Sequence, residues 1–272
     1  MSSVTIKQLF YYPVKSCAGV EVAEAQMGAS GLLNDRRWMV VDANGIFVTQ
    51  RERPELALVF PRVEEGVLSL CAPQAPALAV PVDARGERIQ VEIFGERYPA
   101  QTVSESADVW FSQYLKAPHR LVAFDDAVLR KGGVQYPKRD DAPTLFPDNY
   151  GLLVLSDASL ADLNQRMPEP VPVNRFRPNV VISGLKAYEE DYLANLKIGG
   201  SQLRFVDLCF RCNLTTIDQN TAEFGEEPLK TLMSYRVDPK NSGVKFGAYF
   251  AVEEVQPRRL RVGDEVQITW SF

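Results

Sequence analysis

Alternating apolar and polar residues predict a chain built mostly of β-strands. Residues 4–12 alternate and then meet Pro13, which is typical of a strand that ends at a turn. Further apolar runs flank short turn sequences, and each such pair predicts a β-hairpin. The expected hairpins cover residues 39–49, 61–70, 89–103 and 196–207, and residues 260–268 are expected to form a strand, a tight turn and a strand. So many short strands indicate a β-rich architecture that is barrel-like in its carboxy-terminal part.

A few segments have the spacing of short amphipathic helices. Serine is the expected N-cap of the first two, at Ser106 and Ser156. The expected helices cover residues 106–116 and 156–167, together with a short segment that starts at Pro228 and has Leu229, Leu232 and Met233 as its apolar face. The predicted fold class is therefore mainly β with a few helices, that is, α+β.

Two segments rich in turn residues and proline are expected to lie outside central structure. The prolines of residues 72–81 place that segment at a surface connection or a sheet edge. Residues 125–148 lose all periodicity, and so long a run in a compact protein is usually a functional loop or a domain linker.

Composition narrows the class of protein. The 272 residues suffice for one large or two modest domains, and 46% hydrophobic with 24% charged residues is typical of a soluble globular protein. The formal net charge of -5 provides no overall basic surface, so nucleic-acid binding is not expected. No apolar run approaches the roughly 20 residues that cross a bilayer, so neither membrane association nor a targeting sequence is expected.

Cys209 and Cys212 form a C-x-x-C pair, expected on a turn between strands because residues 213–217 look extended. A thioredoxin-like redox pair would need a helix after the cysteines. A zinc site would need four ligands, whereas Cys17 and Cys71 are isolated. A pair of small core thiols is a further reading. Scattered cysteines argue against a disulfide framework, and a working thiolate requires a reducing compartment, so we expect the cytoplasm.

Four motifs follow one another along the chain. They are Tyr-Pro-Val-Lys-Ser at residues 12–16, Arg-Phe-Arg-Pro-Asn at 175–179, Cys-Phe-Arg-Cys-Asn-Leu-Thr-Thr-Ile-Asp at 209–218 and Glu-Pro-Leu-Lys-Thr-Leu-Met-Ser-Tyr-Arg at 227–236. Together they resemble the MOSC-domain family, and within it the YcbX and mitochondrial amidoxime-reducing component type. The resemblance implies an amino-terminal β domain at residues 1–124, followed by a MOSC β-barrel domain at residues 125–272.

The same resemblance implies a molybdenum–molybdopterin cofactor in the cleft between the two domains. Cys212 is the implied thiolate ligand of the metal, and a soft thiolate suits a metal whose other sulfur ligands come from the pterin. Cys212 and Arg211 are the implied catalytic residues. The implied cofactor-binding residues are Lys15, Ser16, Arg36, Asn149, Tyr150, Arg177, Asn179, Phe210 and Arg211.

Each cation in this set has an implied partner. Lys15 and Ser16 are expected to bind the terminal phosphate of the cofactor, and Arg36 to contact a phosphate or the pterin. Arg177 is expected to be a bidentate anion clamp, held in an extended backbone by the following Pro178. Arg211, beside the thiolate, is expected to favour its ionised form.

The remaining implied residues have weaker assignments. Asn179 is expected to bind either the pterin or the neighbouring loop, and Phe210 is expected to contribute only its backbone. Asn149 and Tyr150 are expected on the pterin side, although Tyr150 stands where a small hydroxyl residue is more usual. Cys209 is expected to lie next to the metal-binding thiolate without binding the metal itself.

The implied activity is the reduction of N-hydroxylated compounds to amines by cleavage of the N–O bond. YcbX-type proteins often carry an additional ferredoxin-like domain, so a separate electron donor is expected here: a ferredoxin, a flavoprotein reductase or a cytochrome b5-like protein. The competing hypotheses are a carrier of persulfide sulfur or of molybdenum cofactor, since a nucleophilic thiol serves either purpose, and a domain with a vestigial site. For proton donation the sequence offers Asp218, while His119 is expected at the surface.

Overall fold

The computed structural model describes residues 3–132, 142–256 and 259–271. Its largest sheet has eight strands in the order β18-β14-β15-β16-β12-β13-β1-β2. Within this sheet β12 and β13 pair in parallel, and the other neighbours are antiparallel. The bounds are β1 (Thr5–Tyr11), β2 (Val20–Val22), β12 (Leu152–Ser156), β13 (Val180–Ser183), β14 (Leu193–Ile198), β15 (Ser201–Arg211), β16 (Val244–Glu254) and β18 (Val266–Trp270).

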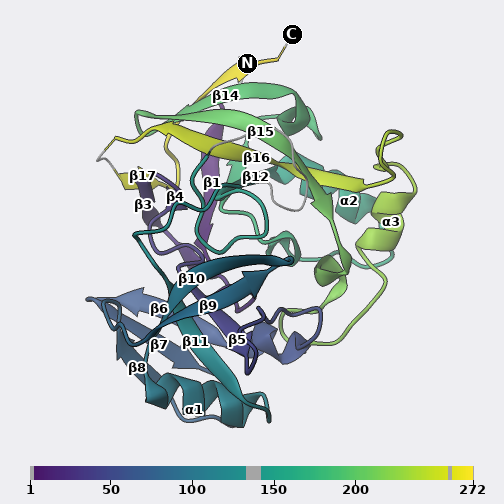
Figure 1. Cartoon of the computed structure of the whole chain (residues 1–272). Helices are drawn as coiled ribbons and strands as arrows, with labels where there is room; N and C mark the ends of the chain where they lie inside the picture. Colours follow the sequence, from purple (N-terminus) through teal and green to yellow (C-terminus); the bar gives the residue numbers. More distant parts are fainter. Residues whose placement is uncertain (1–2, 133–141, 257–258, 272) are drawn as a thin grey trace.

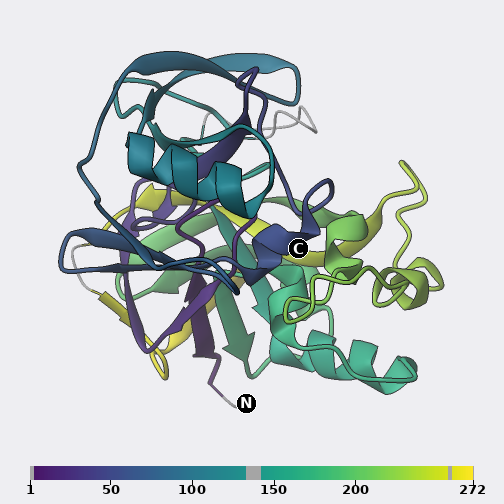
Figure 2. The ribbon, with the colours of Figure 1, turned by 90° about the horizontal axis from the view of Figure 1, so that it is seen from below.

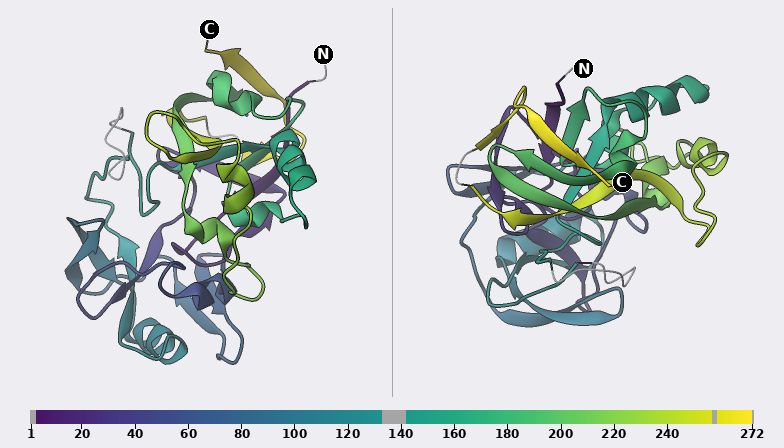
Figure 3. Two further views of the ribbon diagram at one scale, coloured as in Figure 1. Left: turned by 90° about the vertical axis from the view of Figure 1, so that its right-hand side faces the viewer. Right: turned by 90° about the horizontal axis from the view of Figure 1, so that it is seen from above.

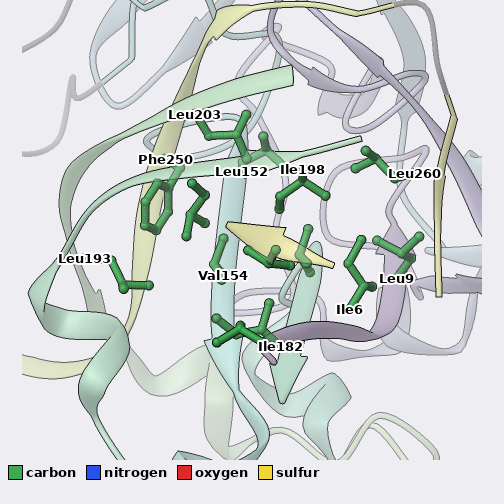
Figure 4. Close-up of a cluster of buried hydrophobic side chains, with 14 of the residues drawn as sticks. Ile6, Leu9, Leu152, Val154, Ile182, Leu193, Ile198, Leu203, Phe250 and Leu260 are labelled. Atoms are coloured by element: carbon green, nitrogen blue, oxygen red, sulfur yellow. The ribbon is translucent and has the colours of Figure 1, made fainter. Parts of the chain in front are cut away.

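The main hydrophobic core lies on one face of this sheet. Alternate residues of a strand point to the same face, so Leu152 and Val154 of β12, both fully buried, share this face. Figure 4 shows them meeting Ile6 and Leu9 of β1 and Phe250 of β16 in one interior. Burial of each such side chain contributes about 1.5–3 kcal/mol, so this core holds the strands that carry the site.

A second part of the molecule lies below the large sheet in Figure 1. It contains a four-stranded sheet in the order β5-β11-β10-β9 and a three-stranded sheet in the order β6-β7-β8. Helix α1 (Glu105–Tyr114) covers its far end (Figure 2). The strand bounds are β5 (Trp38–Asp42), β6 (Phe60–Glu64), β7 (Val67–Cys71), β8 (Leu78–Pro81), β9 (Arg88–Ile93), β10 (Glu96–Thr102) and β11 (His119–Phe124), and a 3-10 helix, η1, covers Pro54–Leu58.

The first strands of the chain lie with the last ones. β1 pairs with β13, and β3 (Glu24–Gly28) pairs with both β4 (Gly31–Leu32) and β17 (Arg259–Arg261). Both chain ends therefore lie on the side of the molecule away from α1 (Figure 3). The domain boundary that we predict after residue 124 stays a prediction, and strands β1 to β4 contribute to sheets on the other side of it.

The remaining helices are short. They are α2 (Asp157–Arg166), α3 (Leu229–Met233), η2 (Val173–Phe176), η3 (Glu189–Tyr192) and η4 (Asn213–Thr216). A mainly β chain with a few helices is confirmed, and the four predicted hairpins are present, the first as β5 with an antiparallel bridge between Val41 and Phe47. The two strands predicted in residues 260–268 are present as β17 and β18, but they pair with β3 and β14 and not with each other. No helix in the described ranges has the length and apolar character needed to span a bilayer.

The predicted helix caps are half right. Ser156 caps α2 as expected. The cap of α1 is Ser104 and not Ser106, because the Ser104 hydroxyl accepts a hydrogen bond from the Ala107 backbone N–H at 3.2 Å. Serines two residues apart are equally good caps by composition, so the sequence pattern placed the start of the helix two residues late.

Two exposure predictions are wrong. His119 is buried at the start of β11, where its ring nitrogen Nδ1 lies 2.7 Å from the Ala117 carbonyl oxygen. Met233 is 58% exposed, whereas Leu232 beside it is fully buried, because the single turn of α3 packs only one side against the core. Residues 72–81 do form a sheet edge as predicted, through β8, and part of the predicted loop at 125–148 lies outside the described residues.

Candidate active site

A pocket lies between the two parts of the molecule, lined by segments from both. The structure brings every predicted site residue to its wall: Lys15, Ser16, Arg36, Asn149, Tyr150, Arg177, Asn179, Phe210, Arg211 and Cys212. These residues come from loops after β1, β4 and η2, from the segment before β12, and from the end of β15. Their roles stay predictions, but their assembly around one cavity is observed.

Backbone hydrogen bonds tie the segment after β1 to the segment before β5. The Lys15 N–H donates to the Trp38 carbonyl at 2.7 Å, and the Arg36 N–H donates to the Tyr12 carbonyl at 2.7 Å. The buried carboxylate of Asp35 accepts the Tyr12 N–H at 2.8 Å. These bonds place Lys15 and Arg36 on one wall although they are distant in sequence.

Three of the predicted site residues have left-handed backbones, with φ of 64° at Ser16, 47° at Arg36 and 55° at Arg177. Such conformations cost non-glycine residues on the order of 1–3 kcal/mol each and persist where the surrounding structure enforces them, often at functional sites. For Arg177 the predicted extended backbone is wrong. Its N–H closes η2 by donating to the Asn174 carbonyl at 3.2 Å, so the residue acts as the helix C-cap despite the following Pro178.

The ring of Tyr12 lies between two of the arginines. Its centroid is 4.1 Å from the guanidinium carbon of Arg36 and 4.3 Å from that of Arg177. Its hydroxyl donates to the Pro178 carbonyl at 3.0 Å, and burial raises the pKa of Tyr12 to about 12. Burial and the neighbouring Arg36 lower the pKa of Arg177 to about 10, which leaves it charged at neutral pH.

Arg36 is also held by acid and amide groups. It donates to both oxygens of Asp35, at 2.8 and 2.6 Å, and to the Asn179 side-chain oxygen at 3.2 Å. Asn179 is 1% exposed, accepts the Leu153 N–H at 3.1 Å and donates to the Phe10 carbonyl at 3.3 Å. Of the two roles predicted for Asn179, these contacts favour the one toward the protein.

Lys15 and Arg51 share the carboxylate of Asp148. Lys15 is buried, is ion-paired with Asp148 and donates to the Phe146 carbonyl at 2.8 Å. Arg51 lies 3.3 Å from the other oxygen of Asp148 and 3.8 Å from the Cys212 sulfur. Burial lowers the pKa of Lys15 to about 8, against the opposing effect of Asp148. Burial alone would raise the pKa of Asp148, but Lys15 and Arg51 outweigh it and hold that pKa at about 2.

Arg177 and Arg211 are held by backbone carbonyls instead. Arg177 donates to the Cys17 carbonyl at 2.8 Å. Arg211 donates from Nε to the Phe246 carbonyl at 2.8 Å and from Nη1 to the Phe176 carbonyl at 2.9 Å. Because carbonyls carry no formal charge, these bonds do not neutralise the two guanidinium groups. Their positive charge is therefore available to a ligand.

The two cysteines of the C-x-x-C pair have opposite environments. Cys209 lies within β15 and is 1% exposed, and burial raises the pKa of its thiol. Cys212 lies just past the strand, is exposed, and lines the pocket. The core-thiol reading therefore suits Cys209 and not Cys212.

The prediction that residues 213–217 are extended is wrong for residues 213–216, because η4 follows Cys212 directly, and holds for Ile217. A redox pair is therefore no longer disfavoured by an extended segment after the cysteines. The raised pKa of buried Cys209 still argues against one, because it makes that thiol a poor nucleophile. For the zinc reading, the described residues contain no group of three or more His, Cys, Asp or Glu side chains that could hold a metal ion.

Three buried polar atoms in residues that line the pocket have no hydrogen-bond partner among the described residues: Asn149 Oδ1, Arg175 Nε and Arg211 Nη2. A buried polar atom left without a partner costs about 1–3 kcal/mol, so such atoms are rare without a reason. A polar ligand in the pocket would supply partners. Asp218, the predicted carboxylate, is instead bound to Arg175 at 2.8 Å and is not among the lining residues.

Two tyrosines of the pocket wall, Tyr150 and Tyr249, contact each other. Tyr150 is 5% exposed, and its ring centroid is 5.7 Å from that of Tyr249. Burial and then the neighbouring Cys209 raise the pKa of Tyr249 well above its usual value. The position of Tyr150 is therefore that of a wall residue packed against β16.

Sequence reasoning missed five polar or charged lining residues: Arg51, Asp148, Arg175, Thr215 and Tyr249. Asp148 directly precedes a predicted residue, and Arg175 and Thr215 fall inside quoted motifs, so their positions were available as signals. Arg51 and Tyr249 lie in no motif. Their approach to the pocket depends on how the two parts pack and on the register of β16.

Comparison with known proteins agrees with this architecture. The family model described as the MOSC N-terminal beta barrel domain matches residues 3–118, and that of the MOSC domain matches residues 141–267. The chain is 37% identical to mitochondrial amidoxime reducing component 2 of Bos taurus over 278 residues, covering 96% of this chain and 82% of the relative.

Two further relatives extend this comparison. Mitochondrial amidoxime-reducing component 1 of Homo sapiens is 37% identical over 280 residues, covering 97% of this chain and 82% of the relative. Molybdenum cofactor sulfurase of Danio rerio is 33% identical, covering 92% of this chain but 32% of that protein. The chain therefore belongs to the MOSC-domain family and consists of an N-terminal beta barrel domain followed by a MOSC domain.

Proposed function

We propose that this chain uses a molybdenum cofactor to reduce N-hydroxylated compounds, such as hydroxylamines, amidoximes and N-hydroxylated bases, to amines. Relatives that align over nearly the whole chain carry names of amidoxime-reducing components. The observation that carries the proposal is the position of Cys212, an exposed thiol at the wall of a pocket lined by many cations. Those cations are Lys15, Arg36, Arg51, Arg175, Arg177 and Arg211.

The chemistry of this pocket fits an anionic cofactor that brings most of its metal's ligands. Cys212 would be the thiolate ligand that the protein supplies. Lys15 and Ser16 would bind the terminal phosphate, and Arg36 and Arg177 would bind phosphate or pterin oxygens. When bound, the cofactor supplies the two-electron reduction of the N–O bond.

Arg51 and Arg211 would have different roles in the pocket. Arg51, with Nη1 3.8 Å from the Cys212 sulfur, is placed to donate a hydrogen bond to it, whereas sequence reasoning placed only Arg211 beside this sulfur. Arg211 is fixed by the carbonyls of Phe176 and Phe246 and keeps Nη2 for a ligand. Phe210 lies half-buried between Cys209 and Arg211, where its backbone can border the cofactor.

N–O reduction consumes two electrons per turnover, and a separate protein would supply them. A ferredoxin, a flavoprotein reductase or a cytochrome b5-like protein suits this role. A reducing compartment suits the free thiols, and the cytoplasm stays our prediction, although the similar relatives carry mitochondrial names.

Activity of protein made in a molybdopterin-producing host tests the proposal. With a chemical reductant, the loaded protein should reduce an amidoxime and an N-hydroxylated base. Cys212→Ser should lose this activity, and Cys71→Ser, which removes an exposed cysteine on β7 outside the pocket, should keep it. Loaded wild-type protein that reduces neither compound would contradict the proposal.

A carrier of persulfide sulfur or of molybdenum cofactor is the second candidate. The exposed Cys212 thiol beside Arg51 favours it, and one relative is named a molybdenum cofactor sulfurase. Cyanide-labile sulfur on Cys212 in protein without metal would support a sulfur carrier. Bound molybdenum without any reduction would support a cofactor carrier.

A further inference from the structure

Asp148 neutralises the end of the pocket where an anion is expected. It is the one acidic side chain among the described residues that line the cavity. Its hydrogen-bond partners among the described residues are the two cations Lys15 and Arg51. The positive charge that would attract a phosphate is therefore already engaged by a carboxylate of the same chain.

This carboxylate is placed to move. Its side chain is 29% exposed, whereas that of Lys15 is 4% exposed. The backbone on either side is fixed, because buried Arg130 donates to the Pro147 carbonyl at 2.8 Å and Asn149 is buried. Rotation of the Asp148 side chain toward solvent would thus release both cations without moving the wall.

An anion that reaches Lys15 meets this carboxylate. Two like charges within a few ångströms of one cation repel strongly in a site that water reaches only in part. The Lys15 ammonium group already uses two of its three N–H donors, for Asp148 and for the Phe146 carbonyl, so an intact ion pair leaves one donor for a phosphate.

We propose that Asp148 is an internal counter-ion that stands in for an anionic ligand group at Lys15 and Arg51, so that a phosphate-bearing ligand binds by displacing it. That the ligand is a phosphorylated cofactor rests on the proposed function. Asp148 then stabilises the empty pocket and restricts it to ligands that bind well enough to displace the carboxylate. Because Arg51 also contacts the Cys212 sulfur, the displacement occurs beside the reactive thiol.

Binding of inorganic pyrophosphate to the full chain, purified from a host that makes no molybdopterin, tests this exchange. Calorimetry at low salt would compare the wild type with Asp148→Asn and Asp148→Ser. Both neutral variants should bind pyrophosphate about tenfold more tightly or better, since a repelling charge is lost and a cation is freed. Adding Lys15→Gln to Asp148→Asn should abolish the gain.

Asp126→Asn is the matched control, because Asp126 forms an ion pair with Arg37 on an exposed surface, at 2.6 Å and with 65% of the side chain exposed. Its affinity for pyrophosphate should stay within about twofold of the wild type. Neutral variants that fold, by thermal unfolding, and yet bind pyrophosphate no better than the wild type would overturn the proposal.

A crystal structure of the wild-type chain with pyrophosphate reads the exchange without any substitution. Asp148 turned away from Lys15 supports the proposal, and an intact Asp148–Lys15 pair or an absence of bound pyrophosphate overturns it. Neither experiment uses the metal. A finding that the chain binds no molybdenum would therefore contradict the proposed function without deciding whether Asp148 is displaced.

Discussion

The cations of the pocket fall into two groups that the protein holds in different ways. The carboxylates of Asp35, Asp148 and Asp218 hold Lys15, Arg36, Arg51 and Arg175. Arg177 and Arg211 are held by backbone carbonyls. In the proposed exchange, Lys15 and Arg51 of this acid-held group give up Asp148 for an incoming anion, whereas Asp35 is buried and keeps Arg36 in place. The carbonyl-held group is part of the scaffold and presents permanent charge, so one group regulates binding and the other fixes geometry.

Removal of a carbonyl-held arginine should have the largest effect on stability. Arg211→Met leaves the carbonyls of Phe176 and Phe246 without donors in a buried region, and we expect a loss of about 2–4 kcal/mol in the free energy of unfolding. Urea denaturation measures this loss. A loss of stability below about 1 kcal/mol would contradict the claim that the carbonyl-held arginines are part of the scaffold.

The pH dependence of anion binding should single out the acid-held group. The pKa of Lys15 in the empty chain is about 8, and only the protonated ammonium attracts an anion. Pyrophosphate affinity should therefore fall as pH rises through about 8, by up to about tenfold per pH unit, while Arg177 with its pKa of about 10 stays charged.

Asp148→Asn sharpens this measurement, because Asp148 raises the pKa of Lys15. In that variant the fall in affinity should begin at a lower pH than in the wild type. Calorimetric titrations between pH 6 and 10, a range set by these two pKa values, would show both curves. Identical curves would mean that Lys15 does not bind the anion.

Tyr12 joins the two groups, since its ring lies between Arg36 and Arg177. Tyr12→Phe keeps the ring and removes the hydrogen bond to the Pro178 carbonyl, so we expect a loss of about 1 kcal/mol. Tyr12→Leu, which also removes the ring, should cost more and weaken pyrophosphate binding. Equal costs for the two variants would show that the ring does not organise the arginines.

The smallest effect is expected for an ion pair outside the pocket. Asp126→Asn removes the exposed pair with Arg37 and should change the free energy of unfolding by less than about 0.5 kcal/mol. Thermal unfolding of Asp126→Asn and of Asp148→Asn would compare the loss of stability from the same substitution at an exposed and at a partly buried position. A larger loss at Asp126 than at Asp148 would contradict the importance given to burial.

The strands and hairpins were predictable because alternation and turn residues are local signals. Seven of the ten predicted site residues lie in the quoted motifs, and the same resemblance supplied Arg36, Asn149 and Tyr150. Arg51 and Tyr249 were missed because packing and strand register, which no local pattern encodes, bring them to the pocket. The left-handed backbone of Arg177 and the 3-10 helix after Cys212 were missed for a related reason, since tertiary contacts override the preference of a single residue.

Molybdenum content tests the central claim most directly, because Cys209 and Cys212 are close in sequence and yet Cys209 is buried and Cys212 is exposed. Protein from a molybdopterin-producing host would be assayed as wild type, Cys212→Ser and Cys209→Ser. The account predicts about one molybdenum per chain in the wild type and in Cys209→Ser, and almost none in Cys212→Ser. Full molybdenum content in Cys212→Ser would contradict it.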